Sequence, residues 1–188
     1  MPHLQILLTS TRPGRKGAPV AAWFERQARQ HGGFDVELVD LQAVNLPLFD
    51  EPEHPRFRKY QHDHTKAWSA TVSRADAFVF VTPEYNFSAP PSLVNALDYL
   101  SAEWAYKPVG FVSYGGVAGG TRAVQMTKLT VTALKMMPMA EGVFIPFFSK
   151  YIDANDAFTP EETQNAAAQT MLKELLRWTK AMAVLRQA

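Results

Sequence analysis

Short apolar runs alternate along this sequence with longer stretches of helical periodicity, and this alternation limits the choice of fold more than any other feature. Residues 4–8 form one such run, and residues 77–81 form another, rich in the β-branched and aromatic residues of strands buried on both faces. A third run, residues 109–113, follows a helical stretch. Because parallel strands need crossover connections, this order predicts a parallel sheet with helices on both faces.

Two further strands and five helices complete the predicted order. The strands are expected at residues 34–41 and around residues 142–147, and the proline-rich, charged segment 46–64 is expected to be an ordered surface loop. The first helix is expected from Ala18 to Gly32, the second through Trp68 and Val72, and the third over Leu93, Leu97 and Leu100. The fourth has Met126, Leu129, Ala133 and Met136 on one side. The fifth starts with a capping box at Thr159, Pro160, Glu161 and Glu162 and continues through Met171, Leu172, Leu175, Thr179 and Met182.

Five strands without a second mononucleotide-binding half favour the flavodoxin-like strand order 2-1-3-4-5 over the six-stranded dinucleotide fold. The 188 residues fit one domain of ordinary size. We therefore expect a single α/β domain over residues 1–188, a three-layer sandwich with a five-stranded parallel sheet in the middle. In such sheets ligands bind beyond the carboxyl ends of the strands where the order reverses, which selects the loops after the first, third and fourth strands.

The first of these loops combines hydroxyl, glycine and basic residues in front of a helix. Ser10, Thr11, Arg12 and free backbone amides are expected to face a phosphate group there, with Arg15 and Gly17 in the same site. The loop matches neither the dinucleotide glycine pattern nor the Walker pattern, which favours a phosphomonoester over a dinucleotide or a triphosphate. Such residues are also common in turns, so a purely structural role is the alternative for this loop taken alone.

The other two loops suit a flat heterocycle. The loop after the third strand puts aromatic rings beside hydrogen-bonding groups, and the loop after the fourth strand contains glycines that let backbone amides approach a ligand closely. Taken alone, these glycines could equally be plain turn residues. The residues that we expect to bind a cofactor here are Pro83, Glu84, Tyr85, Asn86, Ser113, Tyr114, Gly115 and Gly116.

Together the three loops resemble those of the NADPH-dependent FMN reductase family, flavodoxin-like enzymes that include quinone, azo-dye and chromate reductases. The family's phosphate loop has the form Gly-Ser-x-Arg, which is similar to the segment from Thr9 to Arg12. The Pro-Glu-Tyr-Asn motif that ends at Asn86 resembles the segment that wraps the flavin ring and ribityl chain. The Ser-Tyr-Gly-Gly motif that ends at Gly116 resembles the segment at the pyrimidine edge of the ring.

The sequence departs from the family pattern at two places. Thr9 stands where the family commonly has glycine, and it either narrows the approach of the backbone to the phosphate or adds a hydroxyl group to it. Pro90 and Pro91 occupy a region where relatives often have glycine, which stiffens the loop on the expected substrate side. Both departures bear on substrate preference more than on flavin binding.

The resemblance implies an FMN-dependent NAD(P)H oxidoreductase. Hydride from NADPH or NADH would pass through bound FMN to a small-molecule acceptor of the flavin, quinone or azo type, in a ping-pong cycle. No catalytic acid–base side chain is then required, because the cofactor carries the chemistry. The resemblance also implies a homodimer or homotetramer with flavin sites near the interface, and Phe87, Trp104 and Tyr106 are candidates for that interface or for the core.

The main alternative is a non-enzymatic FMN-binding electron carrier or redox sensor. Flavodoxin-type carriers tend to be acidic, whereas the net charge here is +1, a balance that also argues against a nucleic-acid partner. The chain has no cysteine, and His54, His62 and His64 lack the spacing of strong metal motifs, so we expect no metal. Apolar stretches are too short for a membrane span or a signal peptide, which predicts a cytoplasmic protein.

Overall fold

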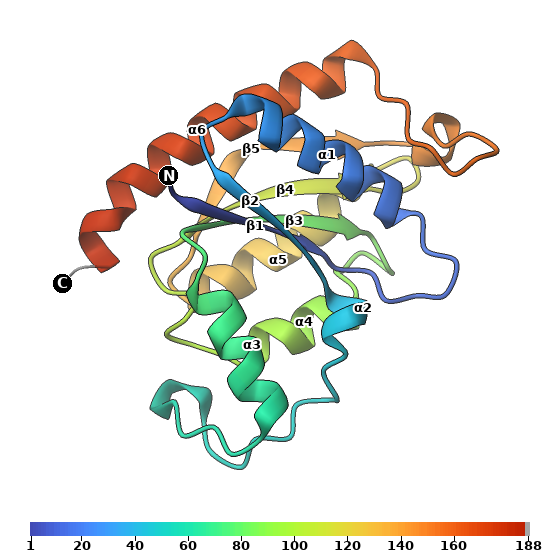
Figure 1. The fold of residues 1–188 in the computed structure, drawn as a ribbon. Helices are drawn as coiled ribbons and strands as arrows, with labels where there is room; N and C mark the ends of the chain where they lie inside the picture. The colour runs from blue at the N-terminus through green and yellow to red at the C-terminus, as the bar shows by residue number, and fades with distance from the viewer. Residues whose placement is uncertain (187–188) are drawn as a thin grey trace.

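The computed structural model describes residues 1–186 and contains a five-stranded parallel sheet in the order β2-β1-β3-β4-β5 (Figure 1). The predicted fold class and strand order are confirmed. The expected domain, residues 1–188, also includes Gln187 and Ala188, which lie outside the described residues.

The strands and helices alternate as the apolar pattern predicts, with one additional short helix after the second strand. Short 3-10 turns lie at Pro55–Phe57 and Phe148–Tyr151. The elements are β1 (His3–Leu8), α1 (Gly17–His31), β2 (Asp35–Asp40), α2 (Leu41–Val44), α3 (Asp63–Ser73), β3 (Ala77–Pro83), α4 (Pro91–Asp98), β4 (Pro108–Tyr114), α5 (Thr121–Ala133), β5 (Met137–Ile145) and α6 (Glu162–Arg186).

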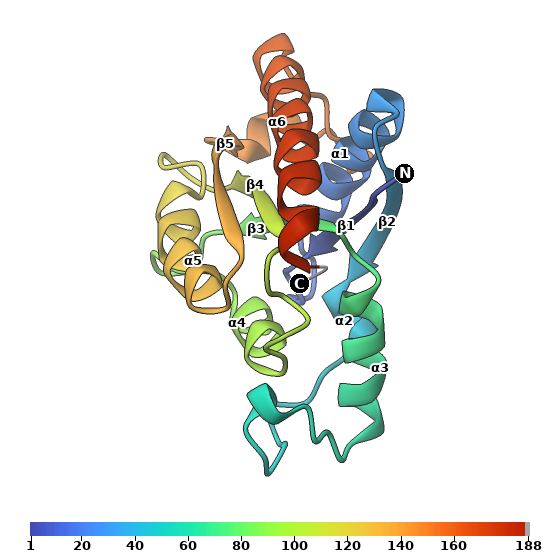
Figure 2. The same cartoon turned by 90° about the vertical axis from the view of Figure 1, so that its left-hand side faces the viewer.

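Two apolar layers hold the helices against the sheet. Helices α1 and α6 cover one face, and α3, α4 and α5 cover the other (Figure 2). Successive side chains of a strand point to opposite faces, so Val79 and Val81 of β3 join the first layer while Phe78 and Phe80 join the second. All seven residues of β3 are buried, which confirms the interpretation of this run as a strand buried on both faces.

The buried face of α5 differs from the predicted one. Met126 and Leu129 were expected to face the core, but they are 51% and 70% exposed, and Ala133 is exposed as well. Met136 is buried, but it lies beyond the end of the helix. A threonine can take part in the buried face because its hydroxyl group donates to a carbonyl one turn earlier. The buried residues of this helix are Ala123, Val124, Thr127 and Val131.

Two predicted boundaries are also wrong. Strand β5 begins at Met137 rather than near residue 142, and Phe147 lies beyond its end in a left-handed conformation. Helix α6 begins at Glu162 and not directly after Thr159, because a different pair caps it: the backbone N–H of Glu161 donates to Oε1 of Gln164 at 2.8 Å.

Two buried carboxylates hold the segment between α2 and α3 in shape, Glu51 by bonds within the segment and Glu103 by bonds from outside it. Glu51 accepts hydrogen bonds from the backbone N–H groups of Gln61 and His62 at 2.8 and 3.1 Å. Glu103 accepts from the hydroxyl groups of Tyr60 and Ser69 at 3.0 and 2.7 Å. Together with the packing of Leu46 and Tyr60 against the core and of Phe49 against Tyr99, these bonds fix a segment that is rich in proline and charge. Among residues 1–186 every helix is too short or too polar to traverse a bilayer.

Candidate active site

Three loops lie together at the edge of the sheet where the strands end (Figure 1). We call them the β1 loop (residues 9–16), the β3 loop (residues 84–90) and the β4 loop (residues 115–120). The hydroxyl groups of Ser10 and Tyr85 are 2.7 Å apart and join the first two loops. The three loops expected from the sequence are therefore brought to one place.

The β1 loop ends in an uncapped helix N-terminus. Lys16 occupies the N-cap position of α1 without a side-chain capping bond, and the first turn contains no acidic residue. The first N–H groups of a helix have no acceptor within the helix, and together with the helix dipole they attract anions. Arg12 is exposed in the same loop, and its guanidinium group forms no ion pair within the described residues. The loop can therefore bind a phosphate group.

Thr9 does not contribute a hydroxyl group to this site. The residue is fully buried, and both its backbone N–H and its Oγ1 donate to the carbonyl oxygen of Val81 in β3, at 3.1 and 3.0 Å. A threonine at this position was expected either to narrow the approach of the backbone to the phosphate or to add a hydroxyl group to it. This geometry excludes the second alternative. The side chain instead ties the end of β1 to its neighbouring strand.

Arg15 and Gly17 lie under the loop rather than on its surface. The guanidinium group of Arg15 donates to the carboxylate of Asp40 and, at 2.6 Å, to the carbonyl oxygen of Ser10. Gly17 is buried, and a Cβ atom on it would lie 2.3 Å from the hydroxyl oxygen of Tyr114. Both residues thus shape the loop from within: the Arg15 side chain is held by protein groups, and the missing side chain of Gly17 leaves room for Tyr114.

The β3 loop is a tight turn that presents its tip to solvent. Tyr85 and Ser88 exchange backbone hydrogen bonds of 2.9 Å, and Asn86 and Phe87 between them have positive φ angles of 50° and 69°. Both of these residues are exposed. Pro83, which precedes the turn, is buried as the last residue of β3. The turn therefore offers the side chains of Tyr85, Asn86 and Phe87 for binding.

The β3 loop is tied to the start of α5 by an ion pair. Nε of Arg122 donates to the Glu84 carboxylate at 2.6 Å, and the backbone N–H of Arg122 donates to the same carboxylate at 3.2 Å. The guanidinium group also lies 4.0 Å from the centre of the Phe87 ring. Because α5 follows the β4 loop directly, this contact fixes the second and third loops relative to each other.

The β4 loop offers main chain rather than side chains. Oγ of Ser113 donates to the carbonyl oxygen of Gly119 at 2.7 Å, and the Tyr114 ring packs against Phe148 with a centroid separation of 5.1 Å. A Cβ atom on Gly115 would come within 3.2 Å of a backbone nitrogen, whereas one on Gly116 would meet nothing within 4 Å. Open space therefore borders the main chain at the tip of this loop.

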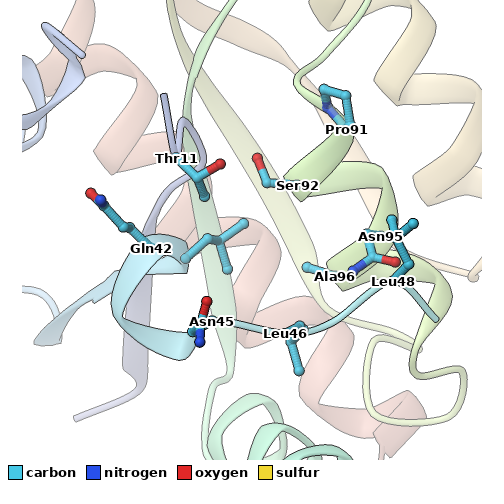
Figure 3. A pocket seen from close by; sticks show the side chains of 10 residues that line it. Thr11, Gln42, Asn45, Leu46, Leu48, Pro91, Ser92, Asn95 and Ala96 are labelled. Carbon is cyan, nitrogen blue, oxygen red and sulfur yellow. The ribbon is translucent and has the colours of Figure 1, made fainter. Parts of the chain in front are cut away.

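A cavity of about 400 Å³ adjoins the β1 loop on the side of α4 (Figure 3). Thr11 from the β1 loop and Ser92 from α4 lie on opposite sides of it, and Gln42 and Asn45 from the segment after β2 line a third side. The last two residues were not predicted. The carboxyl end of β2 lies at the same edge of the sheet as those of β1 and β3. Residues that directly follow the second predicted strand could therefore have been expected near the site.

His62 and His64 lie at the start of α3 and belong to none of the three loops. His62 and His64 stack with a centroid separation of 5.1 Å, and Nε2 of His64 lies 2.9 Å from the carboxylate of Asp50. Within residues 1–186 no group of three or more histidine, aspartate or glutamate residues is arranged to hold a metal ion.

The three loops fit a flavin mononucleotide. The free amides of α1 and the guanidinium group of Arg12 suit its phosphate, and the open space beside Gly116 admits the edge of a flat ring. The half-buried Tyr85 and the exposed Asn86 suit the ring and the ribityl chain. The strand order defines a protein of the flavodoxin-like class, a type of sheet in which ligands bind where the order of the strands reverses.

Comparison with known proteins identifies the family. Residues 2–150 match the family model described as NADPH-dependent FMN reductase, and the chain belongs to this family. An NAD(P)H-dependent FMN reductase of Schizosaccharomyces pombe is 42% identical over 148 residues, which cover 77% of this chain and 74% of that protein. A 2-hydroxy-1,4-benzoquinone reductase of Burkholderia is 29% identical over 155 residues, 78% of this chain and 80% of that one.

A solved structure shares the fold. The flavoenzyme NAD(P)H:(acceptor) oxidoreductase of Paracoccus denitrificans superposes with a TM-score of 0.75 at 19% identity, covering 97% of this chain and 99% of that chain. The family resemblance predicted from the loops is confirmed. The protein is an FMN-dependent NAD(P)H oxidoreductase that uses FMN and NAD(P)H, and family membership favours this enzyme over the alternative of an electron carrier.

Proposed function

We propose that the protein passes reducing equivalents from NAD(P)H to quinone, flavin and azo-type acceptors in a ping-pong cycle at the edge formed by its three loops. The observation that carries this proposal is the uncapped N-terminus of α1 beside the exposed Arg12. The hydrogen bond between Ser10 and Tyr85 places the β3 loop next to it. Bound FMN would supply the hydride and electron chemistry. The chain supplies binding, orientation and polar groups.

The proposed roles of the residues follow from their positions. Ser10, Thr11, Arg12 and the first amides of α1 bind the phosphate, and Tyr85 and Asn86 contact the ring and the ribityl chain. The main chain at Pro83, Glu84, Ser113, Tyr114, Gly115 and Gly116 lines the site, and backbone N–H groups of the β4 loop stabilise negative charge at the pyrimidine edge. Arg15 and Gly17 hold the β1 loop in place.

An anaerobic visible spectrum tests this function. The purified protein is mixed with one equivalent of FMN, and spectra are recorded before and after NADPH is added. We expect a bound-flavin spectrum that bleaches rapidly on addition of NADPH. Flavin that binds without being reduced would contradict the reductase proposal and favour the carrier, and flavin that does not bind would contradict the assignment of the three loops.

Steady-state kinetics test the ping-pong cycle separately. The NADPH concentration is varied at several fixed concentrations of a benzoquinone acceptor. We expect parallel lines in double-reciprocal plots and competitive inhibition of each substrate by the other at high concentration. Intersecting lines would show that both substrates occupy the site together and would overturn the proposed order.

We further propose that the protein is a homodimer or homotetramer with its flavin sites near the interface. Large apolar side chains are exposed on α5 and on the loops beside the site, among them Leu129 at 70%, Val117 at 74% and Phe87 at 62%. Figure 2 shows α5 on the outside of the molecule. Exposed apolar surface of this kind is typical of protein contacts. Trp104, by contrast, is fully buried and belongs to the core.

The remaining parts of the proposal concern the whole chain. We propose that residues 1–188 act as one domain, supported by the single sheet that both apolar layers share. We also propose that the protein works in the cytoplasm, where NAD(P)H is regenerated, on small-molecule acceptors and without a nucleic-acid partner. The net charge of +1 supports the last point.

A further inference from the structure

A second cavity lies at the opposite edge of the sheet, where the strands begin. It has a volume of about 540 Å³, within the range of small-molecule sites. Its walls come from the segments that lead into β4 and β5 and from the last turn of α6, which Figure 1 shows on the side of the strand beginnings. We call it the amino-edge pocket. It shares no residue with the three loops of the candidate active site.

The charged side chains of the amino-edge pocket are mostly cationic. They are Arg58, Lys107, Lys135 and Arg186, against the single carboxylate of Glu103. That carboxylate is already engaged, since its side chain is fully buried and accepts hydrogen bonds from Tyr60 and Ser69, with Nε of Arg58 at 3.4 Å. An anion in the pocket would therefore meet an excess of positive charge.

Two of the cations lack a carboxylate partner in the part of the chain that the structure describes, although each has another contact inside the protein. Arg186 is paired with Asp76 at 3.0 Å, but within the described residues neither Lys107 nor Lys135 has a carboxylate within 4 Å. Lys107 is 6% exposed, and its Nζ donates to the backbone carbonyl oxygens of Val72 and Ser73 at 2.9 and 3.4 Å. Burial and the nearby Arg186 lower its pKa to about 8, so this ammonium group would gain from an anionic neighbour.

Three residues around the pocket have a left-handed backbone, and two of them, Arg58 and Lys135, follow the ends of helices, where this conformation is common. Arg58, Tyr106 and Lys135 all line the pocket and have φ angles of 53°, 60° and 60°, in the left-handed region that side chains rarely adopt. The backbone N–H of Tyr106 donates to the carbonyl oxygen of Lys135 at 2.9 Å, which fixes two of these residues against each other. This bond gives the rim of the pocket a fixed shape.

We propose that the amino-edge pocket binds an organic anion with a compact apolar body and a carboxylate or phosphate group. The proposal rests on the two lysines without a carboxylate partner among the described residues and on the apolar walls that Leu134 and Leu185 contribute. Lys107 and Lys135 bind the anionic group, and the apolar walls cover the body. The pocket is separate from the flavin edge, so the proposal does not depend on the proposed function.

Binding is tested with phenyl phosphate on the full chain carrying FMN, after unbound FMN has been removed. Backbone amide shifts from NMR report where the probe binds, and titration calorimetry reports its affinity. We expect shifts centred on Tyr106, Lys107 and Lys135. Phenol and inorganic phosphate should bind more weakly, because phenol lacks the anionic group and inorganic phosphate lacks the apolar body. Shifts confined to the β1, β3 and β4 loops, or the absence of binding at millimolar concentrations, would overturn the proposal.

Variants test the role of the cations. Lys135→Gln is expected to weaken phenyl phosphate binding about tenfold, the effect of losing one hydrogen bond to a charged group. Lys107→Met is expected to abolish binding, with circular dichroism used to verify its fold because Lys107 also bonds to the end of α3. Lys180→Gln, an exposed lysine elsewhere on α6, is the matched control. Equal affinities of the Lys135 and Lys180 variants would contradict the assignment.

Discussion

Arg12 and Arg15 lie three positions apart in the β1 loop and have different roles. Arg15 is occupied by Asp40 and the Ser10 carbonyl oxygen, whereas Arg12 is exposed and free to reach a ligand. We predict that Arg12→Met raises the dissociation constant of FMN about tenfold or more, because one charge-assisted contact to the phosphate is lost. The change is measured by quenching of flavin fluorescence.

Arg26 on the exposed side of α1 provides the control for that experiment. Arg26→Met removes the same charge from the same helix without touching its N-terminus, so flavin affinity should be unchanged. If both variants bind FMN equally well, a direct role of Arg12 at the phosphate is refuted.

Gly17 is required by packing, and this can be shown independently of any ligand. Alanine is normally the better residue in a helix, but a Cβ atom here would lie 2.3 Å from the Tyr114 hydroxyl oxygen. We predict that Gly17→Ala lowers the free energy of unfolding by about 1–3 kcal/mol, as overpacking does. Tyr114→Phe should partly restore stability in the double variant, measured by urea denaturation. Simple additivity of the two changes would contradict this explanation.

At the scale of elements, the pair of Glu84 and Arg122 is expected to couple the β3 and β4 loops. Arg122→Met should weaken FMN binding severalfold by loosening both loops, although Arg122 lies outside the expected phosphate site. The double variant with Glu84→Gln should be little worse than either single one, because the two residues act through the same contact. Independent effects in a double-mutant cycle of FMN affinity would show that the two loops are not coupled in this way.

The contact between Arg15 and Asp40 joins the β1 loop to the end of β2 and gives stability a pH dependence. Burial alone would raise the pKa of Asp40, but hydrogen bonds from Arg15 and from the backbone N–H of Gln42 bring it below the ordinary value of 3.8. The stabilisation is therefore present above that value and is lost as the pH falls through the lower, folded-state pKa.

Asp40→Asn should accordingly cost stability at pH 7, and its deficit relative to the natural protein should shrink as the solution is acidified below pH 3.8. Thermal unfolding across this pH range measures the effect. Asp63→Asn, at a fully exposed carboxylate on α3, is the control. A deficit that stays constant with pH would contradict the role given to the ion pair.

The apolar pattern of the sequence predicted the helices and strands better than it predicted the contacts between them. The order of strands and helices follows from apolar periodicity, and the three loops follow from the sheet order. The face of α5 could not be predicted, because Met126 and Leu129 satisfy the helical period as well as the smaller residues that are buried. The link from Ser10 to Tyr85 and the pair of Arg15 with Asp40 could not be predicted either, since their partners are 75 and 25 residues apart in the chain.

At the scale of the whole molecule, the exposed apolar side chains on α5 predict self-association. The natural protein should have a mass in light scattering that is a multiple of 21.0 kDa, and Leu129→Arg should shift it toward the single chain by placing a charge in the contact. Val184→Arg, at an equally exposed position on α6, is the matched control. A natural protein that is already a single chain at working concentration would contradict the proposed oligomer.

The position of β1 in the sheet has a consequence for the protein during its synthesis. β1 is made first, yet it lies between β2 and β3, and residues 41–76 must follow β2 before β3 exists. Until then the nascent chain carries an apolar strand with one edge unpaired, the type of surface through which unfinished chains aggregate. β1, which leads into the first of the three loops in the finished enzyme, thus has one unpaired edge on the ribosome, and the long connection before β3 prolongs that exposure.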